Sequence, residues 1–331
     1  MDDNPKNLCY DGETKRGRRQ FLTSVGTIFL AAGIDGLVSG KEVAATRAAS
    51  DSDETLVKAL FDTLTAEQRK IVVLPWNDPK QRFISANWKV TGPSIGSDFY
   101  TREQQHLIDR IFRGVTSQDG YERFLRQMEE DYGGFGSYSM AIFGQPGTGQ
   151  FQWEMTGRHL TIRADGDSVE KSAFGGPIVY GHGAGHSIPG LPGNLFYHQL
   201  KKANEVFGAF DGKQRKRALL ALAPAEDQVP VQGEWGAFPG IPVRDLWPDQ
   251  KMLVEETMKV ILAPYRSEDV AEALALLKQG GGFESLHLAF YESDDLGEDQ
   301  EWEIWRLEGP TFVWHFRGSP HVHTYVNIAR V

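Results

Sequence analysis

The sequence predicts an α+β domain with a mostly antiparallel sheet and with N-terminal and central helical segments packed around it. Apolar residues follow helical spacing over 51–134 and then alternate from residue 138 onwards. Helical spacing returns over 194–278, and alternation returns over about the last fifty residues. Separate helical and strand stretches favour α+β over a regular βα alternation. No internal repeat is apparent, so we expect 51–331 to form one domain.

Local signals define the N-terminal helices. Leucines at helical spacing from Leu56 predict a first helix behind a polar start at Asp53. Thr65-Ala66-Glu67-Gln68 and Thr101-Arg102-Glu103-Gln104 are capping-box patterns, in which a Thr side chain and a Gln three residues later cap a helix start. A third helix is expected over 119–132, where Gly133-Gly134 ends it.

Short alternating segments predict two groups of strands. The first group is expected as a meander at 138–143, 150–155, 159–164 and 168–174. The second group follows the helical middle at 285–291, 301–307, 311–316 and 321–328. Between them lies a Gly/Pro-rich stretch, 175–193, which carries His182 and His186. This stretch is either a flexible surface loop or an active-site lid.

Composition narrows the classes of protein. Of 331 residues, 40% are hydrophobic and 11% are aromatic, which indicates a packed core rather than a disordered chain. The formal net charge is −10, and no basic stripe appears that would neutralise many phosphates. We therefore expect neither nucleic acid nor an anionic membrane as a partner.

The N-terminus has the features of an export signal. Arg18-Arg19-Gln20-Phe21-Leu22 opens a modest apolar run that reaches Val38 and precedes small residues at 43–45. This pattern predicts a cleavable twin-arginine (Tat) signal peptide over 1–45. A membrane anchor is the alternative, but the run is short and is broken by Asp35. We expect a periplasmic or secreted protein that meets the Tat export machinery and has no stable membrane insertion after cleavage.

Cysteine chemistry is excluded from the mature chain. The single cysteine, Cys9, lies in the segment that we expect to be removed. No disulfide, thiolate ligand or cysteine nucleophile then remains. Any metal site must use His, Asp, Glu or Tyr.

A His-x-His pattern near the C-terminus is the first candidate site. His321 and His323 lie two apart in a run with strand character, so their side chains are expected on one face of the sheet. Two imidazoles placed in this way can chelate one metal ion. The alternative is a pair of strand histidines that make ordinary hydrogen bonds.

Several segments together resemble DUF3500, a bacterial family of unassigned function. The resemblance rests on 66–69, 138–146, 153–162, 305–314 and 321–324, which include Trp153-Glu154-Met155-Thr156-Gly157-Arg158-His159-Leu160-Thr161-Ile162 and Trp305-Arg306-Leu307-Glu308-Gly309-Pro310. It implies the fold and adds His159 to His321 and His323, but it implies no activity. The chain departs from the family pattern at Arg158, where a second histidine is usual, and at His315, where an acidic residue is usual.

The three histidines define the leading hypothesis, an exported metal-dependent enzyme, either a hydrolase or an oxidase. Three imidazoles suit Zn²⁺, Cu²⁺ or Fe²⁺ and leave room for water or a small-molecule substrate. Further candidates are a fourth ligand or outer partner and two carboxylate-binding arginines, namely His315, Glu308, Arg158 and Arg306. A non-catalytic periplasmic binding or structural protein is the alternative. Ser168-Val169-Glu170-Lys171 has the spacing of lysine-dependent serine hydrolases but lacks their companion motifs.

Overall fold

The computed structural model describes residues 53–183, 193–297 and 299–331. The predicted signal peptide, His186 and residues 184–192 of the Gly/Pro-rich stretch lie outside these residues. One compact unit, Ala49–Val331, contains every helix and strand of the described chain. Among the described helices, none has the length and apolar character needed to cross a membrane.

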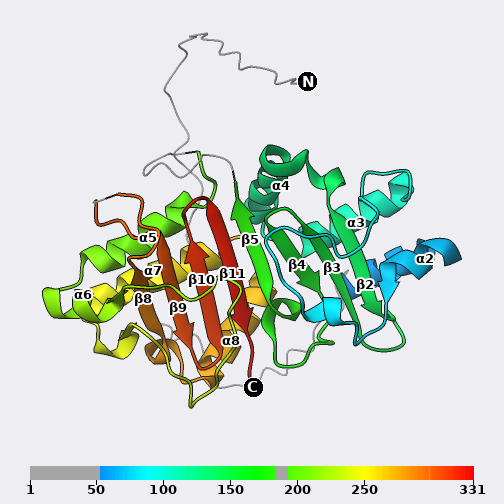
Figure 1. Ribbon diagram of the computed structural model, residues 1–331. Helices are drawn as coiled ribbons and strands as arrows, with labels where there is room; N and C mark the ends of the chain where they lie inside the picture. The colour runs from blue at the N-terminus through cyan, green and yellow to red at the C-terminus, as the bar shows by residue number, and fades with distance from the viewer. Residues whose placement is uncertain (1–52, 184–192, 298) are drawn as a thin grey trace, which may run out of the picture. The chain divides into compact units, whose positions relative to one another are not determined.

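A single eleven-stranded sheet organises the described residues (Figure 1). Its order is β1-β2-β3-β4-β5-β11-β10-β9-β8-β6, and β7 pairs with β8 beside this path. The strands are β1 (Val73–Leu74), β2 (Ser139–Gly144), β3 (Phe151–Gly157), β4 (Leu160–Ala164), β5 (Ile178–His182), β6 (Leu219–Leu220), β7 (Ile241–Pro242), β8 (His287–Tyr291), β9 (Ile304–Gly309), β10 (Phe312–Arg317) and β11 (Val322–Ile328). The helices are α1 (Asp53–Thr63), α2 (Ala66–Val72), α3 (Arg102–Gly114), α4 (Gln118–Tyr132), α5 (Tyr197–Gly208), α6 (Gly212–Ala218), α7 (Pro248–Leu262) and α8 (Ser267–Gln279).

The α+β class is confirmed, but the sheet is mixed, which corrects the expected mostly antiparallel sheet. β1 pairs in parallel with β2, and β6 pairs in parallel with β8. Parallel neighbours need a long crossover connection, and helices supply it in both cases: α3 and α4 between β1 and β2, α7 and α8 between β6 and β8. β1 and β6 have two residues each, which is too short for a periodic signal. The strand expected over 168–174 is also absent from the structure, where turns lead into a 3₁₀ segment, Ala173–Gly175.

The unit contains two halves with the same element order, an internal repeat that the sequence analysis missed. The strand order reads the same outward in both directions from the central β5–β11 pair. In each half, two helices precede a two-residue edge strand, and two further helices lead into four strands; β7, in the second half, has no counterpart strand in the first. The pairing of Gly157 with Leu160 recurs as that of Gly309 with Phe312.

Buried glutamines make the repeat visible at the level of side chains. Gln68 and Gln104 exchange amide hydrogen bonds of 2.9 and 3.0 Å, and Gln214 and Gln250 exchange bonds of 2.9 and 2.8 Å. Both pairs are 36 residues apart. In each pair the second glutamine also closes the cap of the crossover helix that follows the edge strand, α3 or α7.

The two faces of the sheet are covered differently. The main core joins aromatic residues of the helices, such as Phe124, to Trp153 and Trp314 of the sheet. On the opposite face Val313 and Tyr325 pack in a smaller cluster with residues of two loops, one between β1 and α3 and one between β6 and β7. Because strand side chains alternate between faces, residues 321 and 323 share the loop-covered face with Tyr325.

Candidate metal centre

His159 occupies a tight turn between β3 and β4. Its φ of +58° lies in the left-handed region, which is uncommon for a residue other than glycine. The turn is held from several directions. The His159 N–H donates to the Ala86 carbonyl at 2.6 Å, and the Tyr138 hydroxyl and the Gln127 side-chain amide donate to the Arg158 carbonyl at 2.6 and 3.1 Å. These contacts fix the direction of the His159 side chain.

The sheet brings the C-terminal histidines to the same place. His321 directly precedes β11, and His323 is its second residue. β11 pairs with β5, where His323 lies opposite Gly181, and β5 pairs with β4, which begins directly after His159. The three histidines therefore meet although 162 residues separate His159 from His321.

The three imidazoles converge through their Nε2 atoms. The Nε2 of His321 lies 3.1 Å from the Nε2 of His159 and 2.8 Å from that of His323. Ligand atoms of the three residues all lie within 4.8 Å of one another. Three nitrogens bound to tetrahedral zinc at ~2.0–2.1 Å would stand roughly 3.3 Å apart, so the spacing is close to that of a metal ligand set. His159 is 2% exposed, whereas the two C-terminal histidines are half-buried, so the centre opens on their side.

A buried carboxylate orients His159. Oδ2 of Asp131, near the end of α4, lies 2.7 Å from Nδ1 of His159, and its Oδ1 accepts the Gly183 N–H at 2.8 Å. Burial opposes ionisation, but hydrogen bonds from His159, Gln127 and Gly183 hold the pKa of Asp131 below its usual value. An ionised Asp131 keeps the proton of His159 on Nδ1 and leaves a lone pair on Nε2.

A second carboxylate stands behind His323. Oxygens of Glu226 lie 3.0 and 3.2 Å from Nδ1 of His323. Arg317, opposite His323 in the β10–β11 hairpin, places Nη2 2.7 Å from the same nitrogen and donates from Nη1 to Glu226 at 3.0 Å. A guanidinium only donates, so Arg317 and Glu226 favour opposite tautomers. Binding of a cation through Nε2 requires the tautomer that donates to Glu226, with Arg317 directed to the carboxylate.

The three Nε2 atoms have too few protons to satisfy one another by hydrogen bonds. With both Nδ1 protons directed at carboxylates, His159 and His323 each turn an Nε2 lone pair towards His321. Burial and the neighbouring histidines and arginines lower the pKa of His321 to about 4, so it is neutral near pH 7. A neutral His321 has at most one Nε2 proton for two acceptors. A divalent cation would satisfy all three nitrogens.

The other predicted site residues lie elsewhere. His182 is buried at the end of β5, where its Nδ1 accepts the Leu195 N–H at 3.1 Å and its Nε2 lies 2.9 Å from Glu130. His315 and Glu308 were predicted as a fourth ligand or outer partner, and the structure corrects this. Both bond to Arg306 in a buried network on the loop-covered side, at 3.2 and 3.5 Å, and neither hydrogen-bonds to the three histidines.

Arg306 is committed to this network. Its Nη2 donates to the Gln228 carbonyl at 2.8 Å, and the second oxygen of Glu308 accepts from Gln232 at 2.7 Å. Burial, followed by the charge of Arg306, lowers the pKa of His315 to about 3. The network is therefore a structural one, and Arg306 has no free donor face for a substrate carboxylate.

Sequence reasoning missed the groups that orient the histidines: Asp131, Glu226 and Arg317. Asp131 is one of several acidic residues in α4, and Glu226 stands in a Pro-containing loop, so neither carries a local signal. Arg317 could have been found, because the short turn between two predicted strands places it opposite His323.

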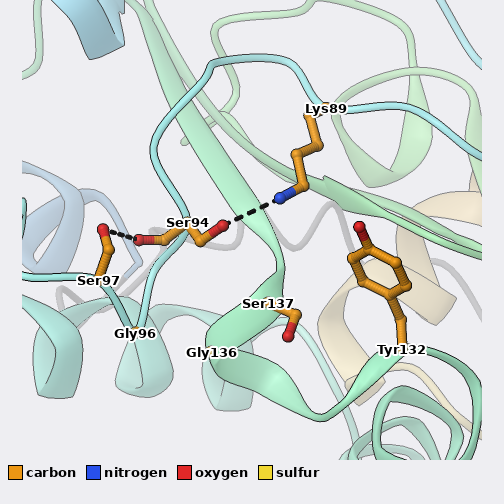
Figure 2. Close-up of a pocket in the computed structure, with 7 residues that line it drawn as sticks. All are labelled: Lys89, Ser94, Gly96, Ser97, Tyr132, Gly136 and Ser137. Atoms are coloured by element: carbon orange, nitrogen blue, oxygen red, sulfur yellow. Dashed lines mark hydrogen bonds between the residues drawn. The ribbon is translucent and has the colours of Figure 1, made fainter.

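A separate hollow of about 500 Å³ lies at the end of α4 (Figure 2). It is lined by Lys89, Tyr132 and a ring of small residues. The Lys89 ammonium group donates to the Ser94 hydroxyl at 2.9 Å and lies 5.7 Å from the centre of the Tyr132 ring, so it already has partners within the hollow. None of the three histidines lines this hollow, and we assign it no role.

In comparisons with known proteins, no curated protein and no solved structure matched the chain. The model of one family, described as a protein of unknown function (DUF3500), matches residues 47–329 and so covers every described strand and helix. The chain therefore belongs to the DUF3500 family.

Proposed function

We propose that the chain is a metal-dependent enzyme whose centre is formed by His159, His321 and His323. One observation supports the proposal above all: the Nε2 of His321 lies 3.1 Å from that of His159 and 2.8 Å from that of His323, while carboxylates stand behind the other two rings. Carboxylate–histidine–metal arrangements of this kind fix the tautomer and strengthen the ligand. Ordinary strand histidines have no need of three nitrogens directed at one point.

Hydrolysis is the chemistry that this ligand set favours. Three neutral ligands leave the full charge on a divalent ion, which lowers the pKa of a bound water to ~7. In the described part of the chain, no Asp, Glu or further His joins the group as a fourth ligand. His321 and His323 are only half-buried, so water and substrate would reach the ion from their side. Copper or iron bound by the same three nitrogens would instead suit an oxidase.

Export is part of the proposal. The paired arginines, the apolar run and the small residues of the first 45 positions support a Tat signal peptide, and the Tat route carries folded proteins with cofactors in place. Fractionation of the native host and N-terminal sequencing of the mature protein test this. A mature chain that begins near residue 46 outside the cytoplasm is expected, and an intact N-terminus in the cytoplasm would contradict it.

Metal analysis of protein purified without a histidine tag tests the centre. We expect about one Zn²⁺, Cu²⁺ or Fe²⁺ per chain, lost in His321→Ala and in His323→Ala. His106→Ala is the matched control, because His106 is exposed on α3 and outside the centre. A wild-type chain that holds no metal, and whose thermal stability is unchanged by added Zn²⁺ or Cu²⁺, would sink the proposal.

Activity assays on the same purified protein distinguish an enzyme from a non-catalytic binding protein. A metal-loaded chain is expected to hydrolyse chromogenic ester or phosphoester probes, and His323→Ala is expected to lose this activity together with the metal. Stoichiometric metal without turnover of any probe, and without oxygen consumption by the copper form, would favour a binding role.

A further inference from the structure

Arg158 stands beside the candidate metal centre with no partner for its charge. Its side chain makes no ion pair or side-chain hydrogen bond within the described residues, and its Nε is shielded from solvent without a partner. Other cations of this region are paired: Arg163 donates to Glu154 at 3.0 Å, and Arg317 to Glu226 at 3.0 Å. The guanidinium of Arg158 is therefore available to a ligand.

The side chain lies against the centre. A Cβ placed on Gly183 would lie 2.9 Å from Cε1 of His159, 3.0 Å from Oδ1 of Asp131 and 3.5 Å from Nη2 of Arg158. The guanidinium and the edge of the His159 ring therefore both border the space that a side chain at position 183 would fill.

Asp131 does not take the place of a ligand. Its Oδ2 interacts with His159 and Gln127, its Oδ1 accepts the Gly183 N–H, and no ion pair joins it to Arg158. A partly buried guanidinium next to a dication is unfavourable unless an anion joins them. An oxyanion does so directly, because one oxygen binds a metal at ~2 Å and another accepts from the guanidinium fork at ~2.8 Å.

We propose that Arg158 and the metal together bind an oxyanion group of the substrate, a carboxylate or a phosphate. The inference rests on the proposed metal centre and deepens it by naming the substrate class. Arg158 then fixes the anionic end of the substrate while the remaining metal position faces the bond that reacts. The backbone at Arg158 is held by Tyr138 and Gln127 through its carbonyl, so the side chain can be changed without releasing the turn.

The test uses the Co²⁺-loaded full-length mature protein, titrated with inorganic phosphate and with acetate and followed by the visible absorption of the bound ion. Both probes are expected to saturate a spectral change in the wild type. In Arg158→Gln, the affinity for the probe that the wild type binds more tightly is expected to fall at least tenfold, with the Co²⁺ stoichiometry unchanged. Arg158→Lys keeps the charge but not the fork of donors, so its affinity is expected to lie between those of the wild type and Arg158→Gln.

Arg217→Gln is the matched control, because Arg217 forms an exposed ion pair with Asp245 away from the centre. It is expected to bind both probes as the wild type does. A wild type that binds no Co²⁺ would refute the metal centre itself. Two outcomes would refute the role of Arg158 alone, provided that Co²⁺ binds normally. One is that the wild type responds to neither probe, and the other is that wild type and Arg158→Gln bind the probes with equal affinity. A stronger response to phosphate than to acetate, or the reverse, names the substrate's anionic group.

Discussion

Replacing Asp131 by Asn tests whether the carboxylate behind His159 sets metal affinity. Asp131 is buried, and its Oδ2 lies 2.7 Å from Nδ1 of His159. In Asp131→Asn one oxygen becomes an NH₂ group. The remaining oxygen can still accept the Gly183 N–H, as Oδ1 does now at 2.8 Å, which places the NH₂ against His159.

The consequence follows from the tautomer. An NH₂ group facing Nδ1 requires that nitrogen to accept, so the proton of His159 moves to Nε2, the atom that would bind metal. Removal of such an outer carboxylate typically costs 10- to 100-fold in metal affinity, or about 1.4–2.7 kcal/mol. Gln127 adds to the loss, because its amide donates to Oδ2 at 2.8 Å and would meet a second donor.

Competition with a chromogenic chelator measures the Zn²⁺ dissociation constant of wild type and variant. Asp109→Asn is the control, since Asp109 also accepts from a ring group, the Tyr121 hydroxyl at 2.6 Å, away from the centre. Urea unfolding of the metal-free proteins separates affinity from stability. The reasoning fails if Asp131→Asn binds Zn²⁺ as tightly as wild type and Asp109→Asn, or if its entire loss follows from unfolding.

Three further predictions concern the surroundings of the centre and the fold. Gly183→Ala places a Cβ 2.9 Å from a ligand ring and is expected to lower Zn²⁺ affinity severalfold in the same competition, whereas Gly149→Ala, which faces open space, leaves it unchanged. Burial lowers the pKa of His315 from 6.5 to about 3. Below pH 6.5 the unfolded chain therefore binds a proton that the folded chain does not bind, and the free energy of unfolding decreases as the pH is lowered. The share of His315 is about 1.4 kcal/mol between pH 7.5 and 5.5, and urea unfolding of His315→Gln at both pH values is expected to lack it. Gln250→Ala leaves the buried amide of Gln214 without its partner and is expected to cost about 1–3 kcal/mol in urea unfolding, with no change in Zn²⁺ affinity; equal stability to wild type would contradict the bonding described.

Local structure was predictable where neighbouring residues decide it. The capping boxes at Thr65 and Thr101 are both formed, with Gln68 and Gln104 as the reciprocal partners. Gly133 ends α4 in the left-handed conformation, with a φ of +74°. Each of these contacts lies within one helical turn, so the sequence pattern contains both partners of the interaction.

The candidate centre was predictable only in part. The period-two spacing of His321 and His323 placed them on one face, and family resemblance added His159. The carboxylates behind the rings were invisible, because Asp131 lies 28 residues from His159 and Glu226 lies 97 residues from His323. No spacing rule reaches across such distances.

The sequence by itself determined the class of the fold, most of its helices and strands, and the histidines that are able to act as ligands. Tertiary structure decided that the sheet is mixed, that two halves repeat around β5 and β11, and that three imidazoles meet beside Arg158. The physical reason is the range of the interactions. Helix caps and strand alternation are set by residues a few positions apart, whereas strand neighbours and ligand partners are chosen by packing and hydrogen bonds between segments up to 162 residues apart.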